Sequence, residues 1–282
     1  MIDLHLHTTA SDGMLTPAKL VALAQARGVR TLSITDHDTM AGVPAAAEAA
    51  AAVGLELLPG VEITAVSEHR DVHLLGYFLD ANPPGLAPFL KEQRDQRVDR
   101  ARTMAARLLD LGAPIDIDQI IESARANDCA VARPLIARAL VAAGCVGNER
   151  EAFDRWIGDG KPAFVPREGT SPTDVVRLIS SSGGISAVAH PGLLRRDDLI
   201  PSLVKAGLTA IEVYHPAHNR ATQTHYVKLA IQHQLAVSGG SDFHGEAHPK
   251  ASCFGSVGLP REAFTKLLQR LLLAHSVVHG ES

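Results

Sequence analysis

The chain has 282 residues, of which 46% are hydrophobic and 21% charged, so it can bury a full core without disulfide bonds. Its net charge of −4 excludes a protein that coats nucleic acid through a broad basic face, but remains compatible with a small anionic substrate. No apolar run is long enough to span a bilayer, no signal peptide is visible, and the three cysteines are widely spaced. We therefore expect a cytoplasmic protein that does not bind a membrane.

The first residues already contain candidate metal ligands. Apolar residues alternate over residues 2–6, which predicts a short strand. On a strand, His5 and His7 point to the same side and form a chelating pair. Asp12 follows in a turn that Ser11 and Gly13 mark.

Strands and helices alternate over the rest of the first 80 residues. Thr16 and Pro17 predict the start of a helix that Gly28 ends. The further expected elements are a strand over 31–35, an alanine-rich helix over 43–53, and strands over 55–63 and 72–78. This alternation indicates a parallel sheet that is either barrel-like or doubly wound.

Residues 83–165 form a mainly helical segment. An arginine-rich run between 93 and 102 is more typical of a solvated helix face than of an anion-binding surface, and both interpretations stay open. We interpret 83–165 as a helical insertion over the active site, and 1–82 with 166–282 as one discontinuous barrel domain.

The alternation returns after the insertion. Ser171 and Pro172 start a helix, strands are expected over 185–189, 210–213 and 236–239, and a helix over 260–278 ends the chain. Nearly every expected strand ends at a histidine or a carboxylate, and strand C-termini are where α/β barrels place their chemistry.

Nine side chains at these positions are candidate metal ligands. Imidazole nitrogens together with carboxylate oxygens suit Mn, Fe or Zn, whereas Ca or Mg sites are richer in oxygen. Nine ligands exceed the needs of one ion, so two or three ions are implied. The candidates are His5, His7, Asp12, His37, Glu62, His73, His190, Asp242 and His244.

These motifs, in this order, resemble the polymerase and histidinol phosphatase (PHP) family of metal enzymes. The resemblance rests on His5-x-His7 with Asp12, Asp36-His37, Glu62 followed by His73, Ala189-His190-Pro191 and Asp242-x-His244. The resemblance implies an α/β fold, a distorted seven-stranded β/α barrel. It also implies three bound divalent transition metal ions, for which Mn²⁺ is expected in preference to Fe or Zn. The implied ligand groups are His5, His7, Glu62 and Asp242; Glu62, His73 and His190; and Asp12, His37 and His244.

Two stretches of the insertion, 133–140 and 160–166, resemble the lid of a branch with 3′,5′-nucleotide bisphosphatases and a 5′-to-3′ exoribonuclease. The resemblance implies hydrolysis of the 3′-phosphate of a nucleoside 3′,5′-bisphosphate, such as 3′,5′-bisphosphoadenosine. Alternatives are a 5′-to-3′ exoribonuclease on short RNA, a histidinol-phosphate-type phosphatase, an amide or lactone hydrolase, and a metal-binding module without turnover. The expected partner is a small phosphorylated nucleotide or short RNA, not extended DNA.

Further residues are candidates for catalysis and substrate binding. The predicted catalytic residues are Glu62 and Asp242, which could bridge ions, and His215, either a proton or hydrogen-bond donor or a satisfied buried histidine.

Arg133 and Lys161 are candidates for a second phosphate site, although Arg133 would also suit a surface ion pair. Ser11 would donate to a phosphate or stabilise its turn. Asp36 or Asp38 would orient a ligand imidazole. His69 and His248 are expected to be ordinary surface residues.

Overall fold

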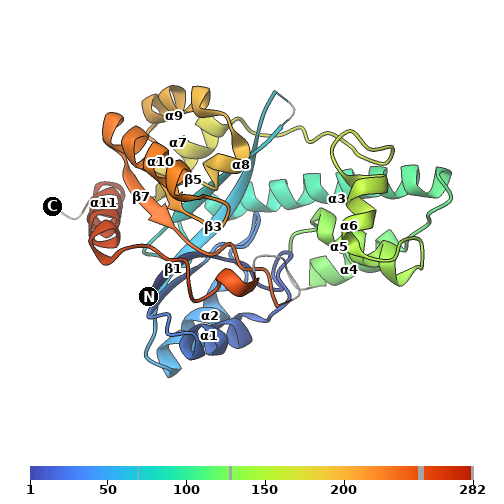
Figure 1. Ribbon diagram of the computed structural model, residues 1–282, viewed down its shortest axis with the longest axis horizontal. Helices are drawn as coiled ribbons and strands as arrows, with labels where there is room; N and C mark the ends of the chain where they lie inside the picture. The colour runs from blue at the N-terminus through green and yellow to red at the C-terminus, as the bar shows by residue number, and fades with distance from the viewer. Residues whose placement is uncertain (69, 127–128, 247–250, 281–282) are drawn as a thin grey trace.

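A seven-stranded sheet curls into a nearly closed barrel in the structure, a computed structural model that describes residues 1–68, 70–126, 129–246 and 251–280 (Figure 1). The strands pair in chain order, with each strand hydrogen-bonded to the next. This confirms the predicted distorted barrel. The strands are β1 (Ile2–Leu6), β2 (Thr31–Ile34), β3 (Glu56–Ser67), β4 (Arg70–Tyr77), β5 (Ile185–Val188), β6 (Ala210–Tyr214) and β7 (Ala236–Gly239).

One strand runs against the others, which corrects the expectation of a purely parallel sheet. β3 and β4 form an antiparallel hairpin, and β4 also pairs antiparallel with β5, whereas the other neighbours are parallel. Only a short turn separates β3 from β4, too few residues for the crossover that a parallel pair requires. β4 therefore begins at the barrel end where its neighbours finish, and His73 enters the site from the first half of β4, opposite Thr64 of β3.

The barrel closes where β1 meets the segment after β7. The His7 backbone N–H donates to the Phe243 carbonyl at 3.0 Å, and the Asp242 N–H donates to the His5 carbonyl at 2.9 Å. Gly240 lies against β1 here: a Cβ atom at this position would sit 2.4 Å from the His5 nitrogen and 2.5 Å from its Cβ. The closure therefore needs a residue without a side chain behind His5.

Helices cover the outside of the barrel and build the insertion. The predicted caps form: Thr16 and Ser171 each accept from a backbone N–H in the first turn, and a proline follows each. The helices are α1 (Pro17–Ala26), α2 (Val43–Ala52), α3 (Leu86–Asp110), α4 (Ile117–Ala126), α5 (Arg133–Ala142), α6 (Glu149–Ala152), α7 (Pro172–Ser181), α8 (Pro191–Leu194), α9 (Ile200–Ala206), α10 (Arg220–Gln232) and α11 (Arg261–His279).

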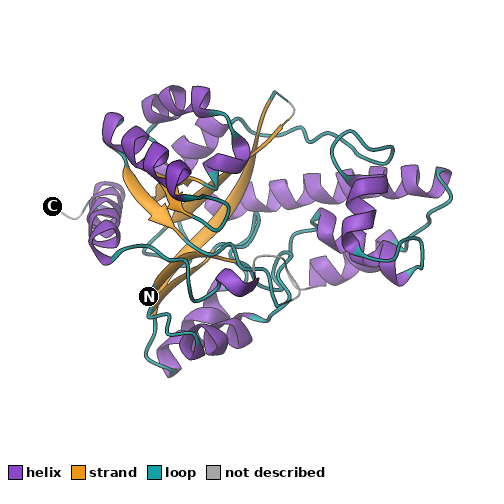
Figure 2. Ribbon diagram, viewed as in Figure 1, coloured by secondary structure: helices purple, strands orange, loops and turns teal. Residues whose placement is uncertain are grey.

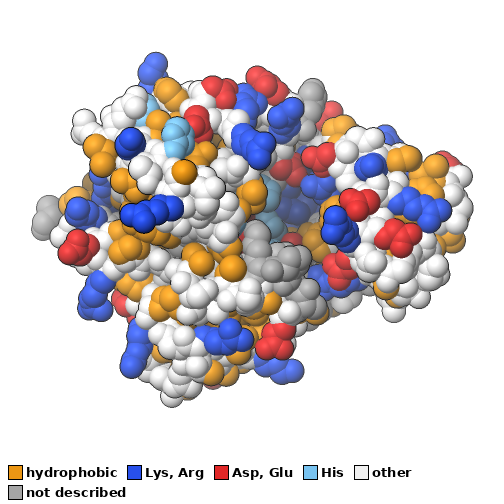
Figure 3. Space-filling view, viewed as in Figure 1, with side chains coloured by type: hydrophobic (Ala, Val, Ile, Leu, Met, Phe, Trp, Pro, Cys, Tyr) orange, Lys and Arg blue, Asp and Glu red, His pale blue; other side chains and the backbone are white. Residues whose placement is uncertain are grey.

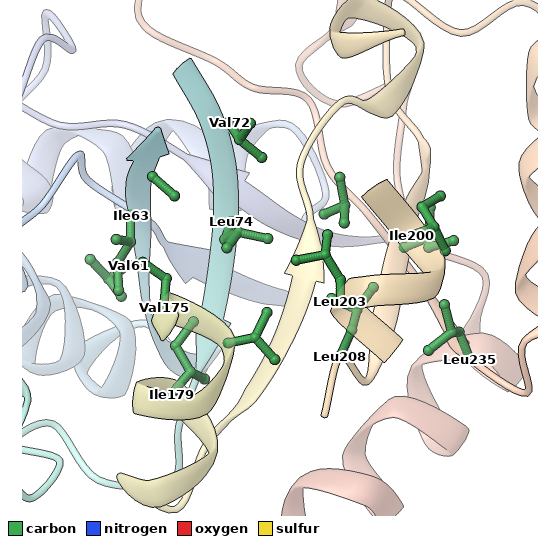
Figure 4. Packing of buried hydrophobic residues seen from close by; sticks show 14 of the residues in the cluster. Val61, Ile63, Val72, Leu74, Val175, Ile179, Ile200, Leu203, Leu208 and Leu235 are labelled. Carbon is green, nitrogen blue, oxygen red and sulfur yellow. The ribbon is translucent and has the colours of Figure 1, made fainter. Parts of the chain in front are cut away.

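Apolar side chains pack between the sheet and its helices. Val61 and Ile63 on β3, with Leu74 on β4, face Val175 and Ile179 on α7 (Figure 4). Burial of this apolar surface is the main favourable contribution to folding, and it fixes the strands whose ends bear the polar residues.

The segment between β4 and α7 contains helices and no strand among its described residues (Figure 2). α3 runs out from the barrel, and α4, α5, α6 and a turn of π-helix at Phe153–Ile157 pack around its far half. Their buried side chains form an apolar cluster separate from those of the barrel. The cluster supports the division into a barrel and an insertion over 83–165, which stays a prediction.

Two further observations concern earlier expectations. In the described part of the chain, no helix combines the length and apolar character that a membrane crossing requires. Cys129, Cys145 and Cys253 form no disulfide bond in the part of the chain that the structure describes. His69 and His248 lie outside the described residues.

The close approach at Gly240 predicts a stability effect. Gly240→Ala forces its Cβ into the His5 backbone, so we expect a loss of about 1–3 kcal/mol in the free energy of unfolding. Urea denaturation of the metal-free protein measures it. Gly147→Ala is the matched control, because a Cβ there meets only a carboxylate oxygen at 3.4 Å. Equal stability of both variants would contradict the proposed closure.

Candidate metal centre and its cavity

The nine predicted ligands converge at one end of the barrel. They come from strands and strand ends far apart in the sequence. Eight of them form three groups, and the ligand atoms of each group lie within 4.8 Å of one another. The groups are His7, Asp12, His37 and His244; His5, His7 and Asp242; and His37, Glu62 and His73. His190 adjoins the third group through Glu62.

Glu62 lies at the middle of the cluster. It is 1% exposed and comes from the middle of β3, not from its end as the sequence indicated. Five imidazole nitrogens surround its carboxylate. They are His5 Nε2 and His7 Nε2 (both 3.2 Å), His37 Nδ1 (3.3 Å), His73 Nδ1 (2.8 Å) and His190 Nε2 (3.1 Å).

Two other carboxylates complete the cluster on either side of His244. The His244 Nε2 atom lies 3.4 Å from Asp12 Oδ1, and its Nδ1 atom lies 3.5 Å from Asp242 Oδ1. Asp242 Oδ1 also lies 3.4 Å from His7 Nε2. The three carboxylates are therefore spread through the histidines, and each has imidazole nitrogens on more than one side.

The donor atoms fit a metal centre better than a protein-only network. Both ring nitrogens of His7 and the Nδ1 atom of His37 are buried and have no hydrogen-bond partner among the described residues. Buried polar atoms left in this way cost free energy, which coordination of an ion would recover. Nitrogen and oxygen donors without thiolate suit divalent transition metals. His7 and His37 each belong to two of the three ligand groups in the structure. The resemblance to the PHP family assigns each of these two histidines to a single ion.

The carboxylates hold their charge because the histidines surround them. Burial alone would raise the pKa of Glu62, but His37 and His73 hold it well below its ordinary value. Burial lowers the pKa of His7, but Asp242 and Glu62 overcome this and raise it to about 10. The metal-free cluster therefore binds protons at positions that an ion would occupy.

Glu212 is a site residue that the sequence analysis missed. It is fully buried on β6, where its Oε1 atom accepts from His5 Nδ1 at 2.8 Å and its Oε2 atom from the His190 backbone N–H at 2.6 Å. It thus leaves His5 Nε2 free to face the cluster, as carboxylate partners of ligand histidines do. The sequence contained one signal for this residue: Glu212 is the only carboxylate within the apolar run 210–213, which indicates a buried charge that needs a partner.

Asp36 and Asp38 do not orient an imidazole, so that prediction was wrong. Asp36 accepts hydrogen bonds from Thr8 and Ser11. Asp38 accepts from Arg97 Nε at 2.6 Å and from Arg167 Nη2 at 3.0 Å. Both carboxylates instead fix the loops that follow β1 and β2.

His215 is buried beside the cluster. Its Nδ1 atom accepts from the Ala217 backbone N–H at 3.1 Å, so a neutral ring has its proton on Nε2. That Nε2 atom lies 3.2 Å from Asp242 Oδ2. Both nitrogens are thus engaged, an arrangement that favours a role in orienting Asp242 over proton donation to a substrate.

A cavity of about 210 Å³ joins the cluster to the insertion. Its lining includes three predicted ligands (Asp12, His37 and His73), three arginines (Arg97, Arg100 and Arg133) and the half-buried carboxylate of Asp71. In the space-filling view, histidine and basic side chains lie side by side in the hollow between the barrel and the insertion (Figure 3).

The arginine-rich run of α3 is therefore not simply a solvated face. Arg97 is 8% exposed, and burial lowers the pKa of the half-buried Arg100 to about 10. Both side chains line the cavity. The sequence analysis weighted this run toward solvent because it could not show which helix face meets the barrel.

The predicted substrate-binding residues differ in position. Arg133 lines the cavity, where it forms an ion pair with Asp159 at 2.6 Å and lies over the ring of Phe164. Lys161 is exposed and is not among the residues that line the cavity. Ser11 donates to Asp36 at 2.7 Å, which supports its role in the turn. Their roles in substrate binding stay predictions.

Residues at the site also adopt strained backbone conformations. Asp38, His190 and Asp242 have φ angles of 51°, 30° and 50°, a region that side-chain-bearing residues rarely adopt. Such strain persists where the surroundings fix the geometry. Here the barrel closure and the hydrogen bonds of Asp38 and His190 provide that fixation.

Comparison with known proteins adds a family relationship. Residues 3–128 match the PHP domain. A phosphoribosyl 1,2-cyclic phosphate 1,2-diphosphodiesterase from Eggerthella lenta is 32% identical over 86% of this chain and 94% of its own.

A 5′-3′ exoribonuclease Rnm from Salmonella typhimurium is 38% identical, and a 3′,5′-nucleoside bisphosphate phosphatase from Chromobacterium violaceum is 37% identical. Each alignment covers 86% of this chain, with 84% and 87% of the respective relative. The crystal structure of a putative metal-dependent phosphoesterase from Bifidobacterium adolescentis matches with a TM-score of 0.86, 32% identity and 95% coverage of both chains.

The protonated histidines predict that metal binding releases protons. Addition of Mn²⁺ to metal-free protein at pH 8 should release on the order of one to three protons, because His7 must lose its proton before it can coordinate an ion. A pH indicator in weak buffer measures the release. Metal affinity should rise with pH between 6 and 8. An affinity independent of pH would contradict this arrangement.

Glu212 should control metal affinity without touching the ions. Glu212→Gln removes the charge behind His5, so we expect metal affinity to fall by about 10- to 100-fold. Calorimetric titration with Mn²⁺ measures it. Glu48→Gln, on the exposed side of α2, is the control and should bind as the parent does. Retained affinity in Glu212→Gln would refute the positioning role.

Proposed function

The chain belongs to the PHP family of phosphoesterases, and from this premise we propose that it hydrolyses the 3′-phosphate of nucleoside 3′,5′-bisphosphates, releasing a 5′-nucleotide and phosphate. 3′,5′-Bisphosphoadenosine is the substrate we put forward. The proposal rests on one observation: a single cavity is lined both by predicted metal-ligand side chains and by three arginines.

The two kinds of lining side chain suit the two phosphates of such a substrate. One phosphate would lie against the metal cluster, and the other would meet Arg100 and Arg133. A volume of about 210 Å³ is below the roughly 300–1,000 Å³ of pockets that enclose a drug-sized ligand. The cavity therefore suits the phosphates and part of the sugar, with the base outside it.

We propose that the nine ligands hold three divalent transition metal ions, with Mn²⁺ preferred to Fe or Zn. Bound ions of this kind lower the pKa of water and neutralise phosphoryl oxygens. Unpartnered nitrogens on His7 and His37 support this assignment. We assign Glu62 and Asp242 to more than one ion each, because several imidazoles meet each carboxylate.

The protein's own groups would position the reacting parts. Glu212 fixes the ring of His5, and His215 fixes Asp242 through its Nε2 proton. Arg97 holds the loop after His37 through Asp38. Arg133 and Arg100 would hold the phosphate that is remote from the metal cluster, the 5′-phosphate. This contact would orient the substrate for attack at the 3′-phosphate.

The exoribonuclease activity is the second candidate, because relatives with that name are as similar as the bisphosphatase. Both activities use the same chemistry and differ in whether the substrate continues beyond one nucleotide. We further propose a cytoplasmic location and no membrane partner. The free cysteines are compatible with a reducing compartment.

A mixed assay separates the candidate substrates. With Mn²⁺ present, we expect faster turnover of 3′,5′-bisphosphoadenosine than of a short 5′-phosphorylated RNA or a ribose 1,2-cyclic phosphate. Phosphate release and chromatography of the nucleotide products measure this. Faster turnover of the RNA would reject the bisphosphatase in favour of the exoribonuclease. No release from any ester, with or without Asp242→Asn, would favour a binding module.

Arg133 should matter for the remote phosphate alone. Arg133→Gln should raise the KM for 3′,5′-bisphosphoadenosine by about tenfold and leave the KM for 3′-AMP nearly unchanged, because 3′-AMP lacks the second phosphate. Steady-state kinetics measure both. Arg150→Gln is the matched control, since Arg150 is 91% exposed. Equal changes with both substrates would place Arg133 outside this subsite.

A further inference from the structure

A second cleft borders the metal cavity and shares Arg97 and Arg100 with it. This cleft lies between α3 and residues 165–169, where the chain returns from the insertion to the barrel. Arg167 lines it from the returning segment. Its volume of about 550 Å³ falls within the roughly 300–1,000 Å³ of ligand-sized pockets.

Arg167 has hydrogen-bonding capacity that the protein does not use. The residue is only 4% exposed, and its Nη2 atom donates to Asp38 Oδ2 at 3.0 Å and to Gln93 Oε1 at 2.7 Å. Its Nε and Nη1 atoms are buried without a partner among the described residues. A guanidinium group has five N–H donors, so three remain unsatisfied. Unpaired buried donors of a charged group are costly and rare.

The charges around Arg167 are also unbalanced. Asp38 is one carboxylate shared by two buried guanidinium groups, those of Arg97 and Arg167. Arg100 donates to a neutral acceptor, the Val165 carbonyl, at 2.8 Å. The half-buried Asp71 adds a second negative charge, which Arg100, Arg133 and Arg167 share. The carboxylates that line the cleft, Asp99 and Glu168, are exposed. Solvent screens exposed charges, so they compensate the buried arginines only weakly.

We propose that this cleft is a second oxyanion site, in which Arg167 and Arg100 bind a phosphate group. Two sources can supply that group. One is a phosphodiester of a nucleotide chain that extends past the metal cavity, and the other is free inorganic phosphate. The first source rests on the proposed nucleotide function, whereas the second does not.

Selenate locates the site directly. Crystals of the metal-loaded protein soaked in selenate should show an anomalous peak beside Arg167, separate from any peak in the metal cavity. In Arg167→Gln the peak in the cleft should disappear while the peak at the metals remains. A cleft that contains only ordered water, or a peak that persists in Arg167→Gln, would overturn the proposal.

Sulfate binding in solution gives a second readout without activity. At constant ionic strength, sulfate should raise the melting temperature, and Arg167→Gln should raise the half-saturating concentration about tenfold or more. Glu168→Gln should lower that concentration about two- to fivefold, because it removes a repelling charge at the cleft. Arg150→Gln should match the parent. An unchanged sulfate response in both cleft variants would reject the site.

Kinetics then separate the two sources. If the phosphodiester is bound, Arg167→Gln raises the KM for a 5′-phosphorylated trinucleotide more than that for 3′,5′-bisphosphoadenosine. If free phosphate is bound, it changes inhibition by inorganic phosphate and alters both KM values equally. Sulfate binding without turnover of any nucleotide would reject the proposed function and leave the oxyanion site intact.

Discussion

The structure depends on the burial of one carboxylate, that of Glu62, among five imidazoles. An isolated buried carboxylate would be strongly destabilising, so this residue requires compensating positive charge at all times. Protons on His7 and His73, whose pKa values are raised, supply it in the metal-free state. The nitrogens of His7 and His37 that form no hydrogen bond indicate that ions supply it otherwise. Closure of the barrel, its strained loops and the Glu212 contact all act to hold ligands around this one group.

Most of the barrel and the convergence of the candidate ligands could be predicted from the sequence, because these features are local. Alternating strands and helices, capped starts at Thr16 and Ser171, and histidines at strand ends each leave a pattern within a few residues. The direction of β4 was missed although it had a local signal, the short connection between the two expected strands. The structure shortens that connection further, because β3 extends to Ser67 and β4 begins at Arg70. Glu212 was missed for another reason: its partners, His5 and His190, are distant in sequence.

The arginines illustrate a different limit. The composition of α3 reveals many guanidinium groups but not which of them turn inward, because the helix packs against loops from elsewhere in the chain. Arg97 meets Asp38, Arg100 meets the Val165 carbonyl, and other arginines of the helix remain in solvent. The function of a charged helix is therefore set by tertiary packing, and charge counts alone favour the wrong face.

The carboxylate of Asp38 joins three parts of the chain at one point: the loop after β2, the helix that leaves the barrel, and the segment that returns to it. Position 97 lies within the helical segment, while positions 38 and 167 lie on either side of it. Recombination between homologous enzymes therefore cannot treat 83–165 as a freely transferable cassette. A chimera would keep this ion-pair network only where both parent proteins have an aspartate at position 38 and arginines at positions 97 and 167.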